Sequence, residues 1–146
     1  MTEGELRDLA AAGVELGAHT VTHPDMSLLD HEACLREMVE SRKALEPLAG
    51  AAVTTFAYPF CRYGQAAVAA AAEAGVLAAV TCEGRGGWSR YELRRAMITG
   101  KDGIPSFLLK ASDAYQPLFD SQAGRLLRIS TRAARARVHL HRSRHG

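Results

Sequence analysis

Helical and strand-like patterns alternate along most of this chain, and glycine or proline residues separate them. Gly13 and Gly75 each follow a segment with helical spacing, and Pro59 follows an apolar strand-like run, as expected at element ends. Helices and strands that alternate through short connections are typical of βα units around a parallel sheet or barrel. The sequence therefore predicts an α/β fold, with helices over 3–12, 27–48, 65–74 and 106–111 and strands over 14–18, 52–58 and 76–81.

The longest of these helices has the clearest pattern. Ser27 or Asp30 can cap its first turn, and Pro47 and Gly50 are expected to close it. The residues that recur at helical spacing predict the face that packs on the core: Cys34, Met38, Ser41, Leu45 and Leu48. The charged residues between them are expected on the solvent side: Glu37, Glu40, Arg42 and Lys43.

The composition is that of an ordinary globular protein, with 47% hydrophobic and 23% charged residues. No apolar run approaches the roughly 20 residues that a membrane-spanning helix needs. Glu3, Glu5, Arg7 and Asp8 occupy the N-terminal region, where a signal peptide would have an apolar stretch. We therefore expect no membrane span and no signal peptide in this chain, and a cytosolic location by default.

Three cysteines, Cys34, Cys61 and Cys82, are widely spaced and form no Cys-x-x-Cys motif. Neither a zinc knuckle nor a redox-active pair is therefore indicated by the spacing. We expect all three side chains to be free thiols in or near the core.

The C-terminal end has a different composition from the rest. From residue 125 onward it contains no aspartate or glutamate, and it carries Arg125, Arg128, Arg132, Arg135, Arg137, Arg142 and Arg144. Such a segment could bind nucleic acid or an anionic surface, or it could be a solvated basic extension. We expect a globular domain over 1–115 and a basic tail over 116–146 that is helical or disordered, and we do not expect nucleic acid as a partner.

Two histidines, His19 and His23, follow the predicted strand 14–18 directly. Imidazoles four residues apart on one loop can both bind a single metal ion. Loops at the carboxyl ends of strands are also where α/β folds place their active sites. The spacing alone leaves a second interpretation open, in which both histidines are unrelated surface residues.

The segment Gly17-Ala18-His19-Thr20-Val21-Thr22-His23-Pro24 resembles the His-Ser/Thr-x-x-His motif of the NodB-type polysaccharide deacetylases. A second segment, Phe56-Ala57-Tyr58-Pro59-Phe60-Cys61-Arg62-Tyr63, is similar to the Phe-Ala-Tyr-Pro-Phe-Gly-x-Tyr stretch of one branch of that family. Together with the order of helices and strands, the resemblance covers roughly residues 6–110.

This resemblance implies a distorted (β/α) barrel and a hydrolase that removes N-acetyl groups from an amino-sugar polysaccharide or oligosaccharide. His19 and His23 would bind Zn²⁺ or another divalent metal, and Thr20 would steady their loop by hydrogen bonding. The backbone N–H of Phe60 would donate to the oxyanion of the reaction. Tyr58, Pro59 and Phe60 would line the sugar groove, although packing at a strand end is an alternative role for them.

The family pattern also contains a Thr-Phe-Asp-Asp-Gly strand that supplies the catalytic base and a further metal ligand, and this sequence has no such segment. Two histidines are fewer than the three protein ligands of a typical catalytic zinc site. Asp25, Asp30 and Cys61 are the nearest residues that could add one. We therefore expect a partial barrel that is missing its first strands, with a centre that is inactive or incomplete in this chain alone. The alternatives are a non-catalytic relative that binds carbohydrate or metal, and a binder of nucleic acid or anionic surfaces through the arginine-rich tail.

Overall fold

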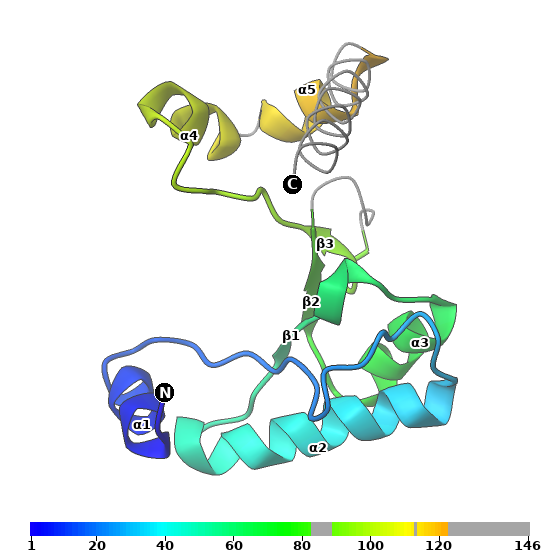
Figure 1. Cartoon of the computed structure of the whole chain (residues 1–146). Helices are drawn as coiled ribbons and strands as arrows, with labels where there is room; N and C mark the ends of the chain where they lie inside the picture. Colours follow the sequence, from blue (N-terminus) through cyan, green and yellow to red (C-terminus); the bar gives the residue numbers. More distant parts are fainter. Residues whose placement is uncertain (83–88, 113, 123–146) are drawn as a thin grey trace, which may run out of the picture. The chain divides into compact units, whose positions relative to one another are not determined.

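The computed structural model describes residues 1–82, 89–112 and 114–122 of the chain. It divides the chain into two compact units, Met1–Arg95 and the residues from Ala96 onward (Figure 1). The boundary expected between residues 115 and 116 stays a prediction. The arginine-rich segment from Arg125 lies outside the described residues.

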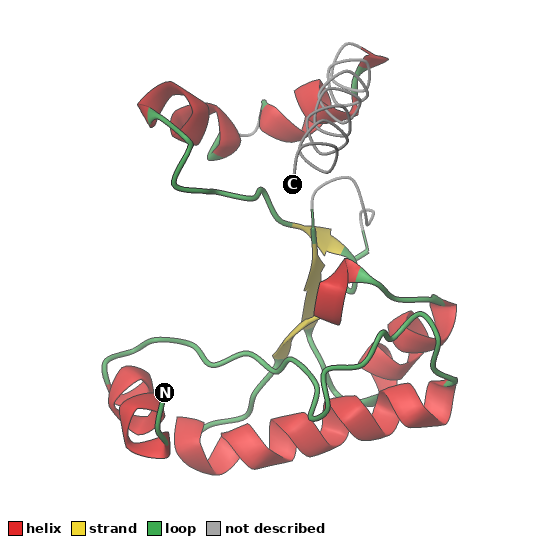
Figure 2. Ribbon diagram, viewed as in Figure 1, coloured by secondary structure: helices red, strands yellow, loops and turns green. Residues whose placement is uncertain are grey.

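A small parallel sheet forms the centre of the first unit (Figure 2). Its strands are β1 (Thr55–Ala57), β2 (Ala78–Thr81) and β3 (Leu93–Arg94), in the order β1-β2-β3. Phe56 lies opposite Ala79, and Val80 lies opposite Leu93. The prediction of an α/β fold with a parallel sheet is therefore confirmed, whereas β3 was not predicted because only two residues form it.

The strand predicted over 14–18 is wrong except at its last residue. Ala18 forms an isolated parallel bridge with Phe56, in which its N–H donates to Thr55 O and its carbonyl accepts from Ala57 N, both at 2.9 Å. Val14 is 49% exposed and Leu16 is partly buried, but neither lies in a strand, so the alternation of apolar residues alone did not produce one. At Gly17 a Cβ would lie 2.9 Å from Thr55 Oγ1, so glycine allows the close approach to β1.

The helices of this unit are α1 (Glu3–Ala11), α2 (His31–Ala49) and α3 (Gln65–Glu73). Asp30 caps α2, because its Oδ1 accepts a hydrogen bond from Ala33 N at 2.8 Å. Gly50, in the left-handed conformation at φ 66°, ends the helix as predicted. Pro47 does not close α2 but lies inside its last turn. α2 packs against both α1 and α3.

Small side chains make up much of the core between these layers. Ala67, Ala70 and Ala71 of α3 are fully buried, which allows α3 to pack closely on Cys34 and Met38 of α2. Cys34 is a buried free thiol, as predicted. Because alanine buries little apolar area, burial of each of these residues contributes less stability than a larger side chain would.

Arg42, in the interior of α2, connects this helix with the segment before β1 and with the end of α3. Arg42 donates hydrogen bonds to the carbonyls of Val53 and Ala74 and to the carboxylate of Glu46. It was expected on the solvent side, but its side chain is 16% exposed. Val53 lies just before β1, and Ala74 directly follows α3. Arg42 therefore supplies hydrogen-bond donors to backbone carbonyls outside the helices and strands.

The second unit contains α4 (Ile104–Lys110) and α5 (Tyr115–Asp120). Asp102 accepts hydrogen bonds from Lys110 Nζ at 2.8 Å and from Ser106 Oγ at 2.7 Å. These bonds, the one from Lys110 first, hold the pKa of the Asp102 carboxyl well below its usual range. None of the helices in the described part of the chain has the length and apolar character needed to cross a membrane.

Candidate functional site

The two histidines lie on the exposed loop between Ala18 and α2. The Nε2 atoms of His19 and His23 are 3.2 Å apart. The other ring nitrogen of His19, Nδ1, lies 2.7 Å from the carbonyl oxygen of Ala57 at the end of β1. The structure therefore brings together the two residues that the motif predicted as metal ligands.

The contact with Ala57 decides which nitrogen of His19 is available. A carbonyl oxygen can only accept a hydrogen bond, so Nδ1 of His19 is the donor, and in the neutral imidazole the lone pair that can bind a metal is on Nε2. Zinc bonds of about 2.0–2.1 Å at tetrahedral angles place neighbouring ligand nitrogens ~3.3 Å apart. The observed 3.2 Å between the two Nε2 atoms fits two ligands of one divalent ion.

The loop that carries the histidines has an unusual backbone. Thr20 and His23 are non-glycine residues with positive φ, 67° and 56°. The Thr20 hydroxyl accepts a hydrogen bond from His23 N at 3.1 Å and donates to His19 O. Since each left-handed residue costs roughly 1–2 kcal/mol, these bonds offset part of the strain that brings His23 back towards His19.

Glu37 of α2 also contacts this loop. It was predicted on the solvent side, but its carboxylate is bound to the loop backbone. Its carboxylate accepts hydrogen bonds from Val21 N at 2.7 Å, Thr22 N at 3.0 Å and Thr22 Oγ1 at 2.6 Å. Partial burial would raise the pKa of Glu37, but the hydrogen bonds from Thr22 and Val21 outweigh this and lower it. The available sequence signal was its position beside Met38, on the border of the buried stripe.

The second predicted motif forms a tight turn directly after β1. Residues Pro59–Cys61 make one turn of 3-10 helix, interrupted at Phe60 by a φ of 52°, and Cys61 has a φ of 55°. Two hydrogen bonds close the turn, from Cys61 N to Tyr58 O at 3.1 Å and from Arg62 N to Pro59 O at 3.0 Å. Neither of them uses the Phe60 N–H, which was predicted as the oxyanion donor.

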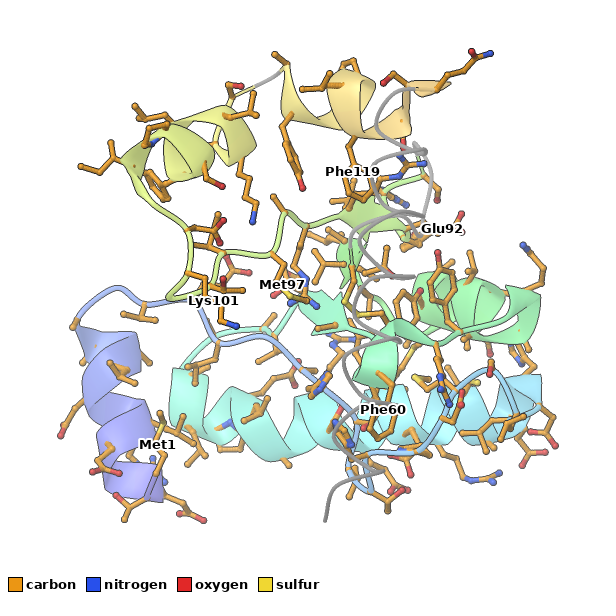
Figure 3. The ribbon with its side chains drawn as sticks, turned by 45° about the horizontal axis from the view of Figure 1, so that its top comes forward. Met1, Phe60, Glu92, Met97, Lys101 and Phe119 are labelled. Carbon is orange, nitrogen blue, oxygen red and sulfur yellow. A yellow bond between two sulfur atoms is a disulfide. The ribbon has the colours of Figure 1, made fainter. Side chains whose placement is uncertain are left out.

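The three residues expected to line a sugar groove have different surroundings. Phe60, which is labelled in Figure 3, is 60% exposed, whereas Tyr58 and Pro59 are buried. The Phe60 ring meets the His23 ring edge to face, with centroids 4.6 Å apart. Of the three side chains, only that of Phe60 is thus presented at the surface beside the histidines.

Tyr58 has the environment of a structural residue. Its hydroxyl donates to Tyr91 O at 2.9 Å, and its ring stacks on Tyr63 with centroids 4.4 Å apart. Burial raises the pKa of Tyr58 far above its usual value, with a smaller contribution from Tyr63. The Tyr63 hydroxyl donates in turn to Glu92, which is labelled in Figure 3. These contacts connect the turn after β1 with the residues just before β3.

The expectation of three free thiols is wrong for two of them, because Cys61 and Cys82 form a disulfide. Their Cα atoms are 5.6 Å apart, within the usual range for disulfides, at a sequence separation of 21. Cys61 lies in the turn after β1 and Cys82 directly follows β2. Since β1 and β2 are parallel neighbours, their carboxyl ends lie side by side, a proximity that linear spacing does not reveal.

The other residues proposed as additional ligands are also engaged elsewhere. Asp25 binds Ser27 Oγ at 2.6 Å and Arg62 Nη1 at 2.9 Å, and these hydrogen bonds, Ser27 first, lower its pKa. Asp30 caps α2, and Cys61 is oxidised. In residues 1–82, 89–112 and 114–122, no three His, Cys, Asp or Glu side chains are arranged to hold a metal. The histidine pair thus fits a metal but makes up only two ligands of a site.

The sequence matches one protein family and two known proteins. The profile of the family described as polysaccharide deacetylase matches residues 1–79. YxkH of Bacillus subtilis, whose name describes a polysaccharide deacetylase, is 28% identical over 103 residues, which cover 68% of this chain and 37% of that protein. A gellan lyase from a Bacillus species is 47% identical over 55 residues, or 37% of this chain and 2% of that protein. The chain thus spans much less than two thirds of the length of either relative.

Solved structures share the fold. The Streptococcus pyogenes deacetylase PplD, determined in complex with acetate, has a TM-score of 0.70 and 22% identity over 77% of this chain and 51% of its own. A polysaccharide deacetylase from Bacillus cereus has a TM-score of 0.68 and 19% identity over 77% of this chain and 37% of its own. At these identities the likeness concerns the fold alone.

Proposed function

Because the chain belongs to the polysaccharide deacetylase family, we propose that it is part of a hydrolase that removes N-acetyl groups from an amino-sugar polysaccharide. We propose a divalent metal ion, with Zn²⁺ as the first candidate, as its cofactor. The observation that carries this proposal is the pair of Nε2 atoms 3.2 Å apart on His19 and His23, with His19 oriented by Ala57 O. The bond broken is an amide C–N bond, and the products are acetate and an amino sugar.

We further propose that the sheet is a segment of a distorted (β/α) barrel. Ala18, β1, β2 and β3 follow one another as parallel neighbours, which is the strand order of such a barrel. The histidine loop and the turn after β1 both leave the carboxyl ends of these strands. That end is where (β/α) barrels gather their catalytic groups.

The residues of this chain would then have the following roles in the reaction. A divalent ion held by the histidine pair would polarise the acetamide carbonyl and make a water molecule more acidic. The hydrogen bond to Ala57 O keeps the free lone pair of His19 on Nε2. The Phe60 N–H would donate to the carbonyl oxygen as negative charge develops on it. The exposed Phe60 ring offers an apolar surface for the sugar or its acetyl methyl group.

The general base and the remaining metal ligands are proposed to come from outside the described residues. Asp25 is held by Ser27 and Arg62, and Asp30 by the first turn of α2. Catalytic zinc usually has three protein ligands. We therefore expect the 146-residue chain to bind metal through His19 and His23 but to release little acetate by itself.

The test is a calorimetric titration of Zn²⁺ into the chain and into a His19→Ala/His23→Ala double variant. His31→Ala is the matched control, because His31 is also partly exposed but pairs with Glu73 at 3.3 Å, away from the site. We expect one-to-one binding that is lost in the double variant and kept in the control. Equal binding in all three proteins would contradict the proposed metal centre.

Acetate release from N-acetylglucosamine oligomers, measured in the same samples, tests the reaction. Release by the wild-type chain that disappears in the double variant would show that the chain completes its own site. Site-specific metal binding without any acetate release, even when the catalytic residues of the family are supplied upstream, would favour a non-catalytic carbohydrate- or metal-binding protein.

A further inference from the structure

We propose that Glu37 is the positioning residue of the histidine loop, an inference that rests on the metal site proposed above. Glu37 belongs to α2, and its carboxylate reaches two of the three residues that lie between the histidines, Val21 and Thr22. It accepts from Val21 N at 2.7 Å, Thr22 N at 3.0 Å and Thr22 Oγ1 at 2.6 Å. One side chain thus satisfies two consecutive backbone donors and a hydroxyl.

The loop needs such an acceptor because of its conformation. Thr20 and His23, which flank Val21 and Thr22, both have positive φ angles. This conformation turns the N–H groups of Val21 and Thr22 towards the same point, outside any helix or strand. Without the carboxylate these donors lose their partner, and the two strained residues can relax to negative φ. His23 would then turn away from His19.

The position of Glu37 itself is fixed by the core. Its neighbour Met38 and the residue one turn earlier, Cys34, are both completely buried. The packing of α2 therefore fixes the position of Glu37, which holds one side of the loop. On the other side, the His19 ring is held by Ala57 O of β1 at 2.7 Å. The histidine pair lies between these two anchors.

Both the negative charge of Glu37 and its two acceptor oxygens contribute to holding the loop. Oε2 accepts the two backbone N–H groups, and Oε1 accepts the Thr22 hydroxyl. A glutamine has the same shape, and with its oxygen on the two backbone N–H groups its NH₂ group faces the Thr22 hydroxyl, which must then accept instead of donate. Glu37→Gln therefore removes the negative charge and replaces charge-assisted hydrogen bonds by weaker neutral ones without changing the volume. Loss of an outer-shell partner typically weakens metal binding by about 10- to 100-fold.

Co²⁺ alone is the probe, and its affinity and visible absorption band are measured for four proteins. These are the wild-type chain, Glu37→Gln, Glu40→Gln and His19→Ala/His23→Ala. Glu40 is the matched control, since it is an exposed glutamate on the same helix. We expect about tenfold weaker binding and an altered band for Glu37→Gln, wild-type behaviour for Glu40→Gln, and no specific band for the double variant.

A second pair of variants tests the same contact from the loop. Thr22→Val removes the hydroxyl that donates to Glu37, and Thr22→Ser keeps it. Thr22→Val is expected to weaken Co²⁺ binding, whereas Thr22→Ser should restore most of the affinity. The amide signals of Val21 and Thr22 in metal-free ¹H–¹⁵N spectra should shift in Glu37→Gln and stay in place in Glu40→Gln.

Two outcomes would overturn the inference in distinguishable ways. If Glu37→Gln unfolds at lower urea but keeps the wild-type Co²⁺ affinity and band, Glu37 is only a structural residue, while the metal site stands. If the wild-type chain and the double histidine variant bind Co²⁺ alike, the proposed metal centre fails first and the role of Glu37 fails with it.

Discussion

The loop from Thr20 to His23 and the turn from Pro59 to Arg62 each hold two non-glycine residues at positive φ, yet different forces hold them. Hydrogen bonds to Glu37 and Thr20 keep the histidine loop in place. The turn is held by the covalent Cys61–Cys82 bond and by the pair between Arg62 and Asp25.

The comparison shows two ways to maintain a strained backbone beside one site. Each left-handed residue costs roughly 1–2 kcal/mol, so both segments need compensation from their surroundings. A disulfide restricts the unfolded chain, and its effect does not depend on pH near neutrality. Carboxylate hydrogen bonds act in the folded state and weaken when the acid is protonated. The histidine loop is therefore expected to be the more sensitive of the two to acid, and the turn to reductant.

Removing the disulfide should give the largest effect. Closing a loop over a sequence separation of 21 residues stabilises a fold by about 3 kcal/mol in the chain-entropy account. Cys61→Ser/Cys82→Ser should lower the free energy of unfolding by that amount in urea denaturation. Dithiothreitol should destabilise the wild-type chain equally and leave the double variant unchanged. Identical curves for the oxidised and reduced wild-type chain would contradict the covalent restraint.

Glu37→Gln should have a smaller effect, about 1 kcal/mol at neutral pH, as expected for hydrogen bonds to a partly exposed charged group. The pKa of Glu37 is lower in the folded state than in the unfolded chain, where it is about 4.3. Its contribution is therefore fully present above pH ~4.3 and lost as the pH falls through the folded value.

Urea unfolding of the wild-type chain and Glu37→Gln at several pH values measures this difference. The two curves should lie apart at pH 7 and converge in acid, and Glu40→Gln should follow the wild-type chain throughout. A difference that is constant over this range would mean that the carboxylate charge of Glu37 has no part in holding the loop.

Arg62→Gln should have the smallest effect on stability. The Arg62 side chain is 59% exposed, and exposed ion pairs contribute little because water screens them. The variant should raise the pKa of Asp25 towards its ordinary value, and the remaining bonds from Ser27 should keep it somewhat low. An NMR titration of the Asp25 carboxyl checks this, and an unchanged pKa would show that Arg62 does not bind Asp25 in solution.

Local patterns in the sequence were sufficient for α1, α2 and α3 and for the proximity of the two histidines, whereas α5 was not predicted as a separate helix. The stripe containing Cys34 and Met38 has the 3.6-residue period that predicts α2, and Asp30 is a good N-cap. His19 and His23 are four residues apart on one loop, so their proximity follows from local geometry. The strand over 14–18 failed because alternation alone does not supply a partner strand, and only Ala18 found one.

Features that depend on the pairing of distant segments could not be predicted in this way. Cys61 meets Cys82 because β1 and β2 are neighbours, which the spacing of the cysteines does not contain. Asp25 was a reasonable candidate ligand by its distance from His23, but Arg62 and Ser27 occupy its oxygens. Glu37 has the pattern of a solvent-facing glutamate, and only the path of the loop makes it an acceptor.

The hydrogen bond between His19 and Ala57 has an evolutionary consequence. Its acceptor is a main-chain carbonyl, which every amino acid possesses, so substitutions at position 57 cannot delete it. The side chain there is free to vary, whereas the length of β1 is not. Inserting or deleting one residue in that strand would shift its register and send successive groups to the opposite face. Selection for the orientation of His19 should therefore be visible as resistance to insertions and deletions around residue 57, and not as conservation of alanine.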